Sequence, residues 1–442
     1  MNSPTRIILP LAILLFAVSS SSTRQAAAQE TLRRVGLEEA LGLFSVNNLD
    51  LRLARSRAAE AAGLARQSRA FPNPTVDLTY EPLSQGYQGY SETYINLRQR
   101  LEISGERRAR GDAADWLFLA AQALVRADSI RLAFTVKRAF VETQMAEDGL
   151  AVTRQAVEVF REGERNAAIR EAEGDISVYD LQRLRLERVR YENLVADADL
   201  AASAARRELA ILVLPDSSTP LGSGGPEVGP AEGTATSPAE PLLGDALEAL
   251  EGFERAVSGR GEVEAAEAEI LAARANDRVA RAVRIPDLTA SAGYKRQSDG
   301  FSGAFLGLSV PIPLFDRRGG EVDAAGVRVR AAEERRMLTR RRVEADLWNA
   351  LESYRSLKDR SVLLDDNGLG GGLNILEIAQ VAYDAGEMTL VELMDAAEAL
   401  RDARIADARL GGGLRIALYD LERALGGFDA VSPEEASTEI GR

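Results

Sequence analysis

The chain has 442 residues and a formal net charge of −14, and it contains neither cysteine nor histidine. Without these two residue types it can form no disulfide, no thiolate or imidazole metal site and no Ser-His or Cys-His catalytic triad, so we expect neither a metal nor a cofactor. The acidic balance also argues against a nucleic-acid partner, whose phosphates need basic residues concentrated on one face. Few aromatic residues and abundant Ala, Leu, Glu and Arg favour long helices over a compact core.

Residues 1–28 have the plan of a cleavable secretory signal. Arg6 precedes an apolar run over residues 7–18, and a Ser-rich neck leads to three alanines at 26–28. A membrane anchor is the alternative, but about twelve apolar residues cannot cross a hydrocarbon core that needs about twenty. No other uninterrupted apolar run is as long, so a membrane would be entered by strands.

The rest of the chain consists of two similar units. Pro74 matches Pro286, Leu101 matches Ile312 and Gly174 matches Gly386, all at a separation of 211 or 212 residues. A large internal repeat of this kind predicts a pseudo-symmetric architecture. We assign the first repeat to residues 29–214 and the second to residues 242–428. A linker rich in Pro and Gly (215–241) joins them, and a polar tail (429–442) follows.

Each repeat is predicted to contain a helix followed by a pair of strands. A helix over residues 36–70 ends at Phe71-Pro-Asn-Pro, because proline disfavours the helical conformation of the residue before it. Period-two alternation then predicts strands over residues 75–80 and 95–103. The second repeat supplies a matching pair over residues 288–294 and 306–312. Four strands per chain is the predicted total.

A long helical hairpin follows each strand pair. Residues 104–173 contain no proline and predict a helix on the order of 100 Å long, which a second helix over residues 176–213 follows back. The second repeat has corresponding arms over residues 317–384 and 389–426. A narrow apolar seam on an otherwise charged surface is typical of coiled-coil packing. Triple glycines at 370–372 and 411–413 interrupt these arms, as kinks or as hinges.

The strands have one apolar and one polar face, which is ordinary for a half-buried strand in a soluble sheet. An isolated strand pair is marginal in water, however, and four strands cannot close a membrane barrel, which needs about eight. Three chains would supply twelve strands and leave no open edge in lipid. The side chains predicted to face lipid are Ile95, Leu97, Leu101, Leu306, Leu308, Val310 and Ile312.

The chain resembles the TolC-like outer-membrane efflux protein family over nearly its whole mature length. The resemblance rests on Phe71-Pro-Asn-Pro, Leu101-Glu-Ile-Ser-Gly-Glu-Arg-Arg, Val310-Pro-Ile-Pro-Leu-Phe-Asp and Ala385-Gly-Glu-Met-Thr-Leu, in that order. The second motif is most similar to the branch that serves heavy-metal cation pumps. The resemblance implies a mainly α fold with a small β part, in which trimers form a coiled-coil tunnel across the periplasm and a twelve-stranded barrel in the outer membrane.

The resemblance also implies functional positions at the helical tips, where family members meet a periplasmic adaptor and, through it, an inner-membrane pump. Glycine permits the tight reversal that a tip requires. The matching tip residues are Gly174, Asp175, Ile176, Ser177, Gly386, Glu387, Met388 and Thr389.

A constriction at the tunnel mouth is implied as well. In the family, acids at the positions of Glu392 and Asp395 attract cations there, and the positions of Asp180 and Tyr383 help to hold the mouth closed. The alternative interpretation of the three acids is that they are ordinary solvated carboxylates. The best-known member of the family has a basic residue where this chain has Met388, and this departure puts the charged part of the closure in question.

We therefore expect a passive outer-membrane duct for an efflux or type I secretion system in a Gram-negative-type cell, with no catalysis. A periplasmic or surface coiled-coil scaffold without a pore is the alternative. An enzyme built on the carboxylates of Glu392 and Asp395 is a weaker one, because nothing like a substrate pocket accompanies them.

Overall fold

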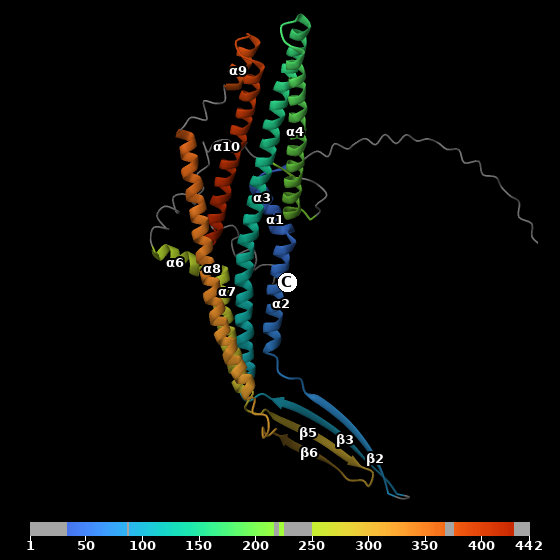
Figure 1. Cartoon of the computed structure of the whole chain (residues 1–442). Coiled ribbons are helices and arrows are strands. Elements are labelled where there is room, and N and C mark those ends of the chain that lie inside the picture. The colour runs from blue at the N-terminus through green and yellow to red at the C-terminus, as the bar shows by residue number, and fades with distance from the viewer. Residues whose placement is uncertain (1–32, 86–87, 216–220, 225–249, 367–374, 428–442) are drawn as a thin grey trace, which may run out of the picture.

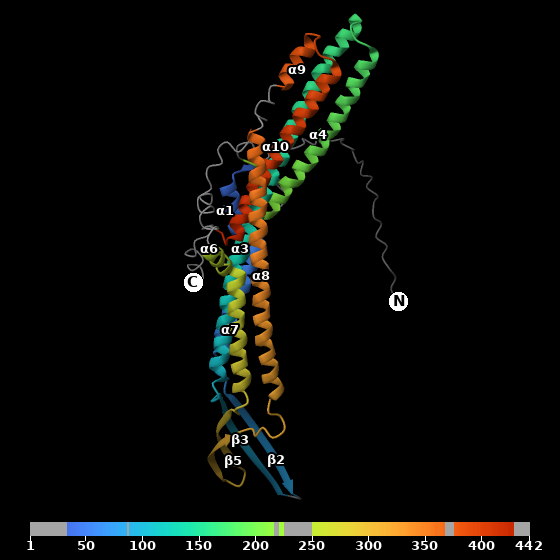
Figure 2. The same cartoon turned by 60° about the vertical axis from the view of Figure 1, so that its left-hand side comes forward.

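The computed structural model describes residues 33–85, 88–215, 221–224, 250–366 and 375–427. The predicted signal peptide (1–28), the predicted polar tail (429–442) and the glycine run 370–372 lie outside these ranges. The described chain is a long rod with a β-sheet at one end and two helical tips at the other (Figures 1 and 2). This mainly helical fold with a small strand part confirms the predicted fold class.

The first repeat begins with a short strand and two helices instead of one. These are β1 (Arg33–Val35), α1 (Leu37–Asn47) and α2 (Leu49–Ser68), so the prediction of one continuous helix over residues 36–70 is wrong. Asn48 breaks it in an extended conformation, and its side chain accepts a hydrogen bond from the Leu51 amide. Asparagine competes for backbone hydrogen bonds and therefore starts helices better than it continues them.

The predicted long hairpins are present in both repeats. The first is formed by α3 (Glu106–Glu173) and α4 (Val178–Val213). The second repeat opens with α6 (Leu250–Ser258) and α7 (Gly261–Ala282). Its hairpin is formed by α8 (Gly319–Asp366), α9 (Ile375–Asp384) and α10 (Leu390–Ala424). None of the helices in the described ranges is both long and apolar enough to cross a membrane.

The two repeats use different side chains for one equivalent contact. Asn48 Nδ2 donates to the Leu212 carbonyl at 3.0 Å, and Arg260 Nη1 donates to the Ala424 carbonyl at 2.8 Å. The two donors lie 212 residues apart in the sequence, and so do the two acceptors. Each contact joins a break between two helices to the C-terminal end of the returning helix, where carbonyl groups lack partners in the helix itself.

Four antiparallel strands form the sheet in the order β2-β3-β5-β6. Their bounds are Thr75–Gln85, Gln88–Leu101, Leu288–Gln297 and Ser302–Ser309. The sixth strand ends earlier than predicted, so Val310 and Ile312 lie beyond it. Pro311 and Pro313 explain the difference, because proline has no N–H group to donate to a neighbouring strand.

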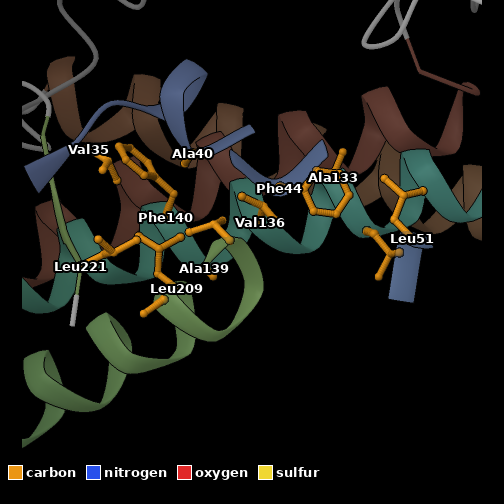
Figure 3. Packing of buried hydrophobic residues seen from close by; sticks show 13 residues of the cluster. Val35, Ala40, Phe44, Leu51, Ala133, Val136, Ala139, Phe140, Leu209 and Leu221 are labelled. Atoms are coloured by element: carbon orange, nitrogen blue, oxygen red, sulfur yellow. The ribbon is translucent and has the colours of Figure 1, made fainter. Parts of the chain in front are cut away.

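A second, smaller sheet corrects the predicted total of four strands. β4 (Leu221–Ser223) falls within the segment predicted as a linker and pairs in parallel with β1. Val35 and Leu221 from this pair enter a core with Phe44, Val136 and Phe140 at the middle of the rod (Figure 3). The small sheet therefore fastens part of the connection between the repeats onto the helices.

The glycine run 411–413 lies inside α10, which continues through it as a helix. Gly412 is buried, and a Cβ atom placed there would overlap the Met145 side chain of α3. This run accordingly permits close approach of α10 and α3, a packing role that the sequence interpretation as kink or hinge did not include.

Gly261 gives the sharpest test of close helix packing. A Cβ atom at Gly261 would lie 2.5 Å from the Ala123 carbonyl oxygen and 3.1 Å from the Ala127 Cβ, and backbone cannot yield as a side chain can. We expect Gly261→Ala to destabilise the protein by about 1–3 kcal/mol. Gly149→Ala in α3 is the matched control, because no atom lies within 4 Å of its added Cβ. The control should be neutral or stabilising by up to about 1 kcal/mol. Thermal unfolding followed by circular dichroism measures both, and equal midpoints for the two variants would contradict the packing argument.

Candidate functional site

Both helical tips turn at glycine. Gly174 ends α3 with φ 86°, and Gly386 follows α9 with φ 76°, a left-handed conformation that disfavours side chains. The Asp175 amide donates to the Arg170 carbonyl, and the Glu387 amide donates to the Ala382 carbonyl. The two turns are therefore equivalent, and they contain all eight predicted tip residues.

The predicted acids Asp180 and Glu392 lie in the first turn of the helix that leaves each tip. The Asp180 amide donates to Ser177 Oγ, whose hydroxyl donates to the Asp180 carboxylate at 2.7 Å. In the second tip, the Thr389 amide and hydroxyl both donate to Glu392 Oε2 at 2.8 Å. Each acid is thus part of the cap that starts its helix.

Capping fixes the charge of Glu392 as well as its position. Its pKa is lowered below the ordinary value of 4.5, mainly by the hydrogen bond from the Thr389 backbone and then by that from the Thr389 side chain. A carboxylate that accepts hydrogen bonds is stabilised in its charged form. The helix-stabilising contribution of this carboxylate is therefore present above pH 4.5 and is lost as the pH falls through the lowered pKa.

Asp395 differs from Glu392 although both lie on the same face of α10. Its side chain is exposed, and it makes no hydrogen bond or ion pair with any residue in the described ranges. Spacing of three residues along a helix places the two carboxylates next to each other. The second tip accordingly presents one carboxylate engaged in a cap and one open to solvent.

Tyr383 and Met388 belong to the apolar contact between the two hairpins. Tyr383 is buried in a cluster that also contains Phe160 of α3 and Leu184 of α4, and Met388 is partly buried against that cluster. The Arg170 guanidinium of α3 lies 5.6 Å from the centre of the Tyr383 ring. Met388 therefore adds apolar packing between the tips.

Charged contacts join the hairpins farther along, and the sequence alone did not indicate them. Arg190 of α4 donates to Glu398 of α10 at 3.3 Å, and Arg401 of α10 lies over the Tyr191 ring at 5.1 Å. The only signal in the sequence was the high density of arginine and acid on α4, which cannot identify individual pairs.

The other end of the rod presents a sheet with two different faces. The register aligns Val76 with Leu97, and Leu97 with Ala292, which in turn pairs with Leu306. Because side chains alternate along a strand, apolar residues gather on one face. Of the predicted lipid-facing side chains, Ile95, Leu97, Leu101, Leu306 and Leu308 share this face; these five are exposed, as are Val310 and Ile312 just past β6.

The opposite face of the sheet is polar and carries ion pairs. Arg98 forms two hydrogen bonds of 2.7 Å with Asp77 on β2. Arg100 donates to Asp287 at 2.7 Å, and Lys295 pairs with Glu92 at 2.7 Å. This face has the character of a surface that contacts water, opposite a face that can contact lipid.

Within the described ranges, no group of three or more acidic side chains is arranged to hold a metal ion. The described geometry consists of two tips with capped, acidic first turns and a sheet with distinct apolar and polar faces. Such an arrangement can line and anchor a passage, and its chemistry is electrostatic.

Comparisons with known proteins identify a family and relatives of similar sequence. The family model described as "Outer membrane efflux protein" matches residues 40–213 and 253–427. The cobalt-zinc-cadmium resistance protein CzcC of Cupriavidus metallidurans is 25% identical over 433 residues, covering 95% of this chain and 99% of CzcC. The nickel-cobalt-cadmium resistance protein NccC of Alcaligenes xylosoxydans xylosoxydans is 30% identical over 344 residues, covering 74% of this chain and 70% of NccC.

A solved structure shares the fold. The outer membrane protein VceC from Vibrio cholerae superposes with a TM-score of 0.71 at 21% identity, covering 88% of this chain and 96% of VceC.

Proposed function

The chain belongs to the outer membrane efflux protein family, and from this membership we propose that three copies form a duct whose cargo is metal cations. The coarser function follows from the family: the protein is an outer-membrane channel component of an efflux system. A scaffold without a pore, the alternative raised by the sequence, does not fit that family.

The observation that carries the trimer is the pair of free edges on the four-stranded sheet. β2 and β6 each have one neighbour among the described strands, so their outer backbone groups lack partners in a single chain. Lipid does not hydrate such groups, and closure into a barrel satisfies them. Three copies supply twelve strands, with β6 of one chain beside β2 of the next.

The helical layer next to the sheet supports the same closure. Its order α2-α3-α7-α8 parallels the strand order, so α2 and α8 lie at its edges (Figure 1). Both edges carry exposed apolar side chains, including Leu49 and Leu64 on α2 and Met337 and Trp348 on α8. Apolar side chains at both edges suit contact with further copies of the same layer.

The helical tips are proposed to meet an adaptor protein on the periplasmic side, through which an inner-membrane pump delivers cargo. The glycine turns Gly174 and Gly386 present both tips at the end of the rod farthest from the sheet. The pump is proposed to supply the energy, and the channel to conduct passively.

Glu392 and Asp395 are proposed to ring the tunnel mouth in the trimer, with Asp180 and Tyr383 supporting its closed form. Threefold repetition would concentrate negative charge in a narrow passage and so attract cations. The carboxylate of Asp395 is open to solvent and would act directly on a passing cation, whereas the carboxylate of Glu392 also caps α10.

Metal cations are proposed as cargo because CzcC and NccC are metal-resistance proteins and match most of this chain. Acidic residues at the mouth suit such cargo electrostatically. The alternative cargo is a secreted protein that passes through the same duct.

The trimer is tested by the mass of the processed protein in detergent after extraction from outer membranes. Light scattering should give about three times the mass of one chain. Leu306→Arg should reduce the amount of assembled trimer, because an arginine on the lipid face costs about 2–4 kcal/mol at the bilayer midplane. Ser309→Arg is the matched control, since Ser309 lies on the polar face of the same strand. A soluble monomer, or equal loss in both variants, would overturn the barrel.

The acidic mouth is tested in the trimer reconstituted into planar bilayers. Glu392→Gln with Asp395→Asn should lower the preference for cations over anions, most clearly at low salt where charge is least screened. Glutamine can retain the cap at position 392. Glu60→Gln on α2, an exposed acid away from the tips, should leave the reversal potential unchanged. An unaltered reversal potential in the double variant would rule out the charged constriction.

The cargo is tested in cells that retain the pump and adaptor but lack this chain. Tolerance to cobalt, zinc, cadmium or nickel salts should fall, and the wild-type chain should restore it. Leu306→Arg should fail to restore tolerance if it fails to assemble. Unchanged metal tolerance together with greater sensitivity to organic compounds would assign a different cargo.

A further inference from the structure

The four-stranded sheet contains four basic residues, and one of them differs from the rest. Arg98, Arg100 and Lys295 project from the polar face, and each is paired with an acid. Arg296 projects from the opposite, apolar face, as its alternation with Lys295 requires. Its side chain is exposed and makes no hydrogen bond or ion pair with any residue that the structure describes.

Arg296 also lies at a particular level of that apolar face. The strand register forms rows across the sheet, and one row contains Val76, Leu97, Ala292 and Leu306. The next row toward the strand turns contains Leu78, Ile95, Tyr294 and Ala304. The row after that contains Tyr80, Thr93, Arg296 and Ser302. The apolar band therefore ends at Arg296, in a row of hydroxyl groups and one guanidinium.

Tyrosines accompany Arg296 at this boundary. Tyr294 precedes it on the same face of β5, and Tyr80 stands in its own row on β2; both rings are at least half exposed. Tyrosine and arginine combine an apolar body with a polar end, and such side chains suit the level where hydrocarbon meets lipid headgroups. This end of the sheet lies opposite the helical tips (Figure 2).

We propose that Arg296 binds the headgroup phosphate of a lipid in the outer leaflet, with the acyl chains of that lipid on the apolar rows below. The proposal rests on the proposed function, because it requires the apolar face to meet lipid. It adds a defined binding position and a ligand chemistry to that face.

The chemistry favours a phospholipid-like amphiphile over a free anion. A single exposed guanidinium gains little from free phosphate in water, where both ions are well hydrated. An amphiphile adds the burial of its acyl chains against Ile95, Tyr294 and Leu306 to the same charge-assisted contact. Its phosphate is also held beside the hydrocarbon layer, where an ion pair is less screened than in bulk water.

The test uses the detergent-purified trimer and lipid A as the probe, in its diphosphorylated form and with both phosphates removed. Native mass spectrometry measures the fraction of trimer that retains lipid. Wild type should retain the phosphorylated form better than the dephosphorylated form. Arg296→Gln should weaken retention by roughly three- to tenfold, the size expected for one charge-assisted contact at an exposed position. Arg296→Lys should recover part of it.

Arg165→Gln on α3 is the matched control, because Arg165 is also exposed and has no partner in the described ranges but lies far from the sheet. It should retain lipid as wild type does. Equal retention by wild type and Arg296→Gln, or no dependence on the lipid phosphates, would overturn the proposal. So would full competition by millimolar inorganic phosphate, which would indicate a free-anion site.

The mass of the complex distinguishes failure of the lipid-site proposal from failure of the proposed channel. If the protein is a trimer and its lipid retention does not depend on Arg296, only the lipid-site proposal is refuted and the proposed channel stands. If the wild-type protein forms no trimer in detergent, both the channel proposal and the lipid-site proposal are refuted.

Discussion

Backbone hydrogen bonding at the edges of the four-stranded sheet is the constraint on which the rest of the architecture depends. β2 and β6 have outer backbone groups that one chain does not pair, and one face of the sheet is apolar from Val76 to Leu308. Water tolerates open edges but not a broad apolar face, whereas lipid tolerates the face but not the edges. Closure with further copies, as proposed for the trimer, would satisfy both requirements, and the helical layer above the sheet would then close in the same order.

Duplication makes that closure geometrically simple. Matched positions such as Gly174 and Gly386 recur about 212 residues apart, so each chain would contribute two similar strand pairs and two similar hairpins to the proposed ring. The equivalence is one of geometry more than of side chains: Asn48 and Arg260 reach matching carbonyls with different chemistry. Arg260 additionally pairs with Glu262 and Asp346, so the second repeat builds a partly buried ionic network where the first uses the amides of Asn47 and Asn48.

Sequence periodicity was enough to predict the elements whose signal is long or strictly alternating. The helices α3 and α4, the tip glycines and the apolar face of β3 all follow from spacing, because a wrong period would expose many residues at once. The break at Asn48, the pairing of β1 with β4 and the fit of Gly412 against Met145 did not follow. The pairing of β1 with β4 and the fit of Gly412 against Met145 depend on contacts between residues 100 or more apart in the chain, which no local pattern encodes. The break at Asn48 does have a local signal, because asparagine is a preferred helix-capping residue. The early end of β6 was available in the sequence, since Pro311 and Pro313 cannot donate to a ladder.

At the tips, the same carboxylates serve the fold and the proposed mouth, and the two roles reinforce each other. Ser177 and Thr389 hold the carboxylates of Asp180 and Glu392 at fixed points on the first helical turn. The hydrogen bonds from Thr389 lower the pKa of Glu392, so that this group remains charged throughout the neutral range. A charge that is fixed in place and insensitive to neutral pH makes a steady electrostatic field, which suits a selectivity ring better than a proton-operated gate. Any opening of the proposed mouth would then come from movement of the helices, which would change the packing at Tyr383 and Met388 and the Arg190–Glu398 ion pair farther along.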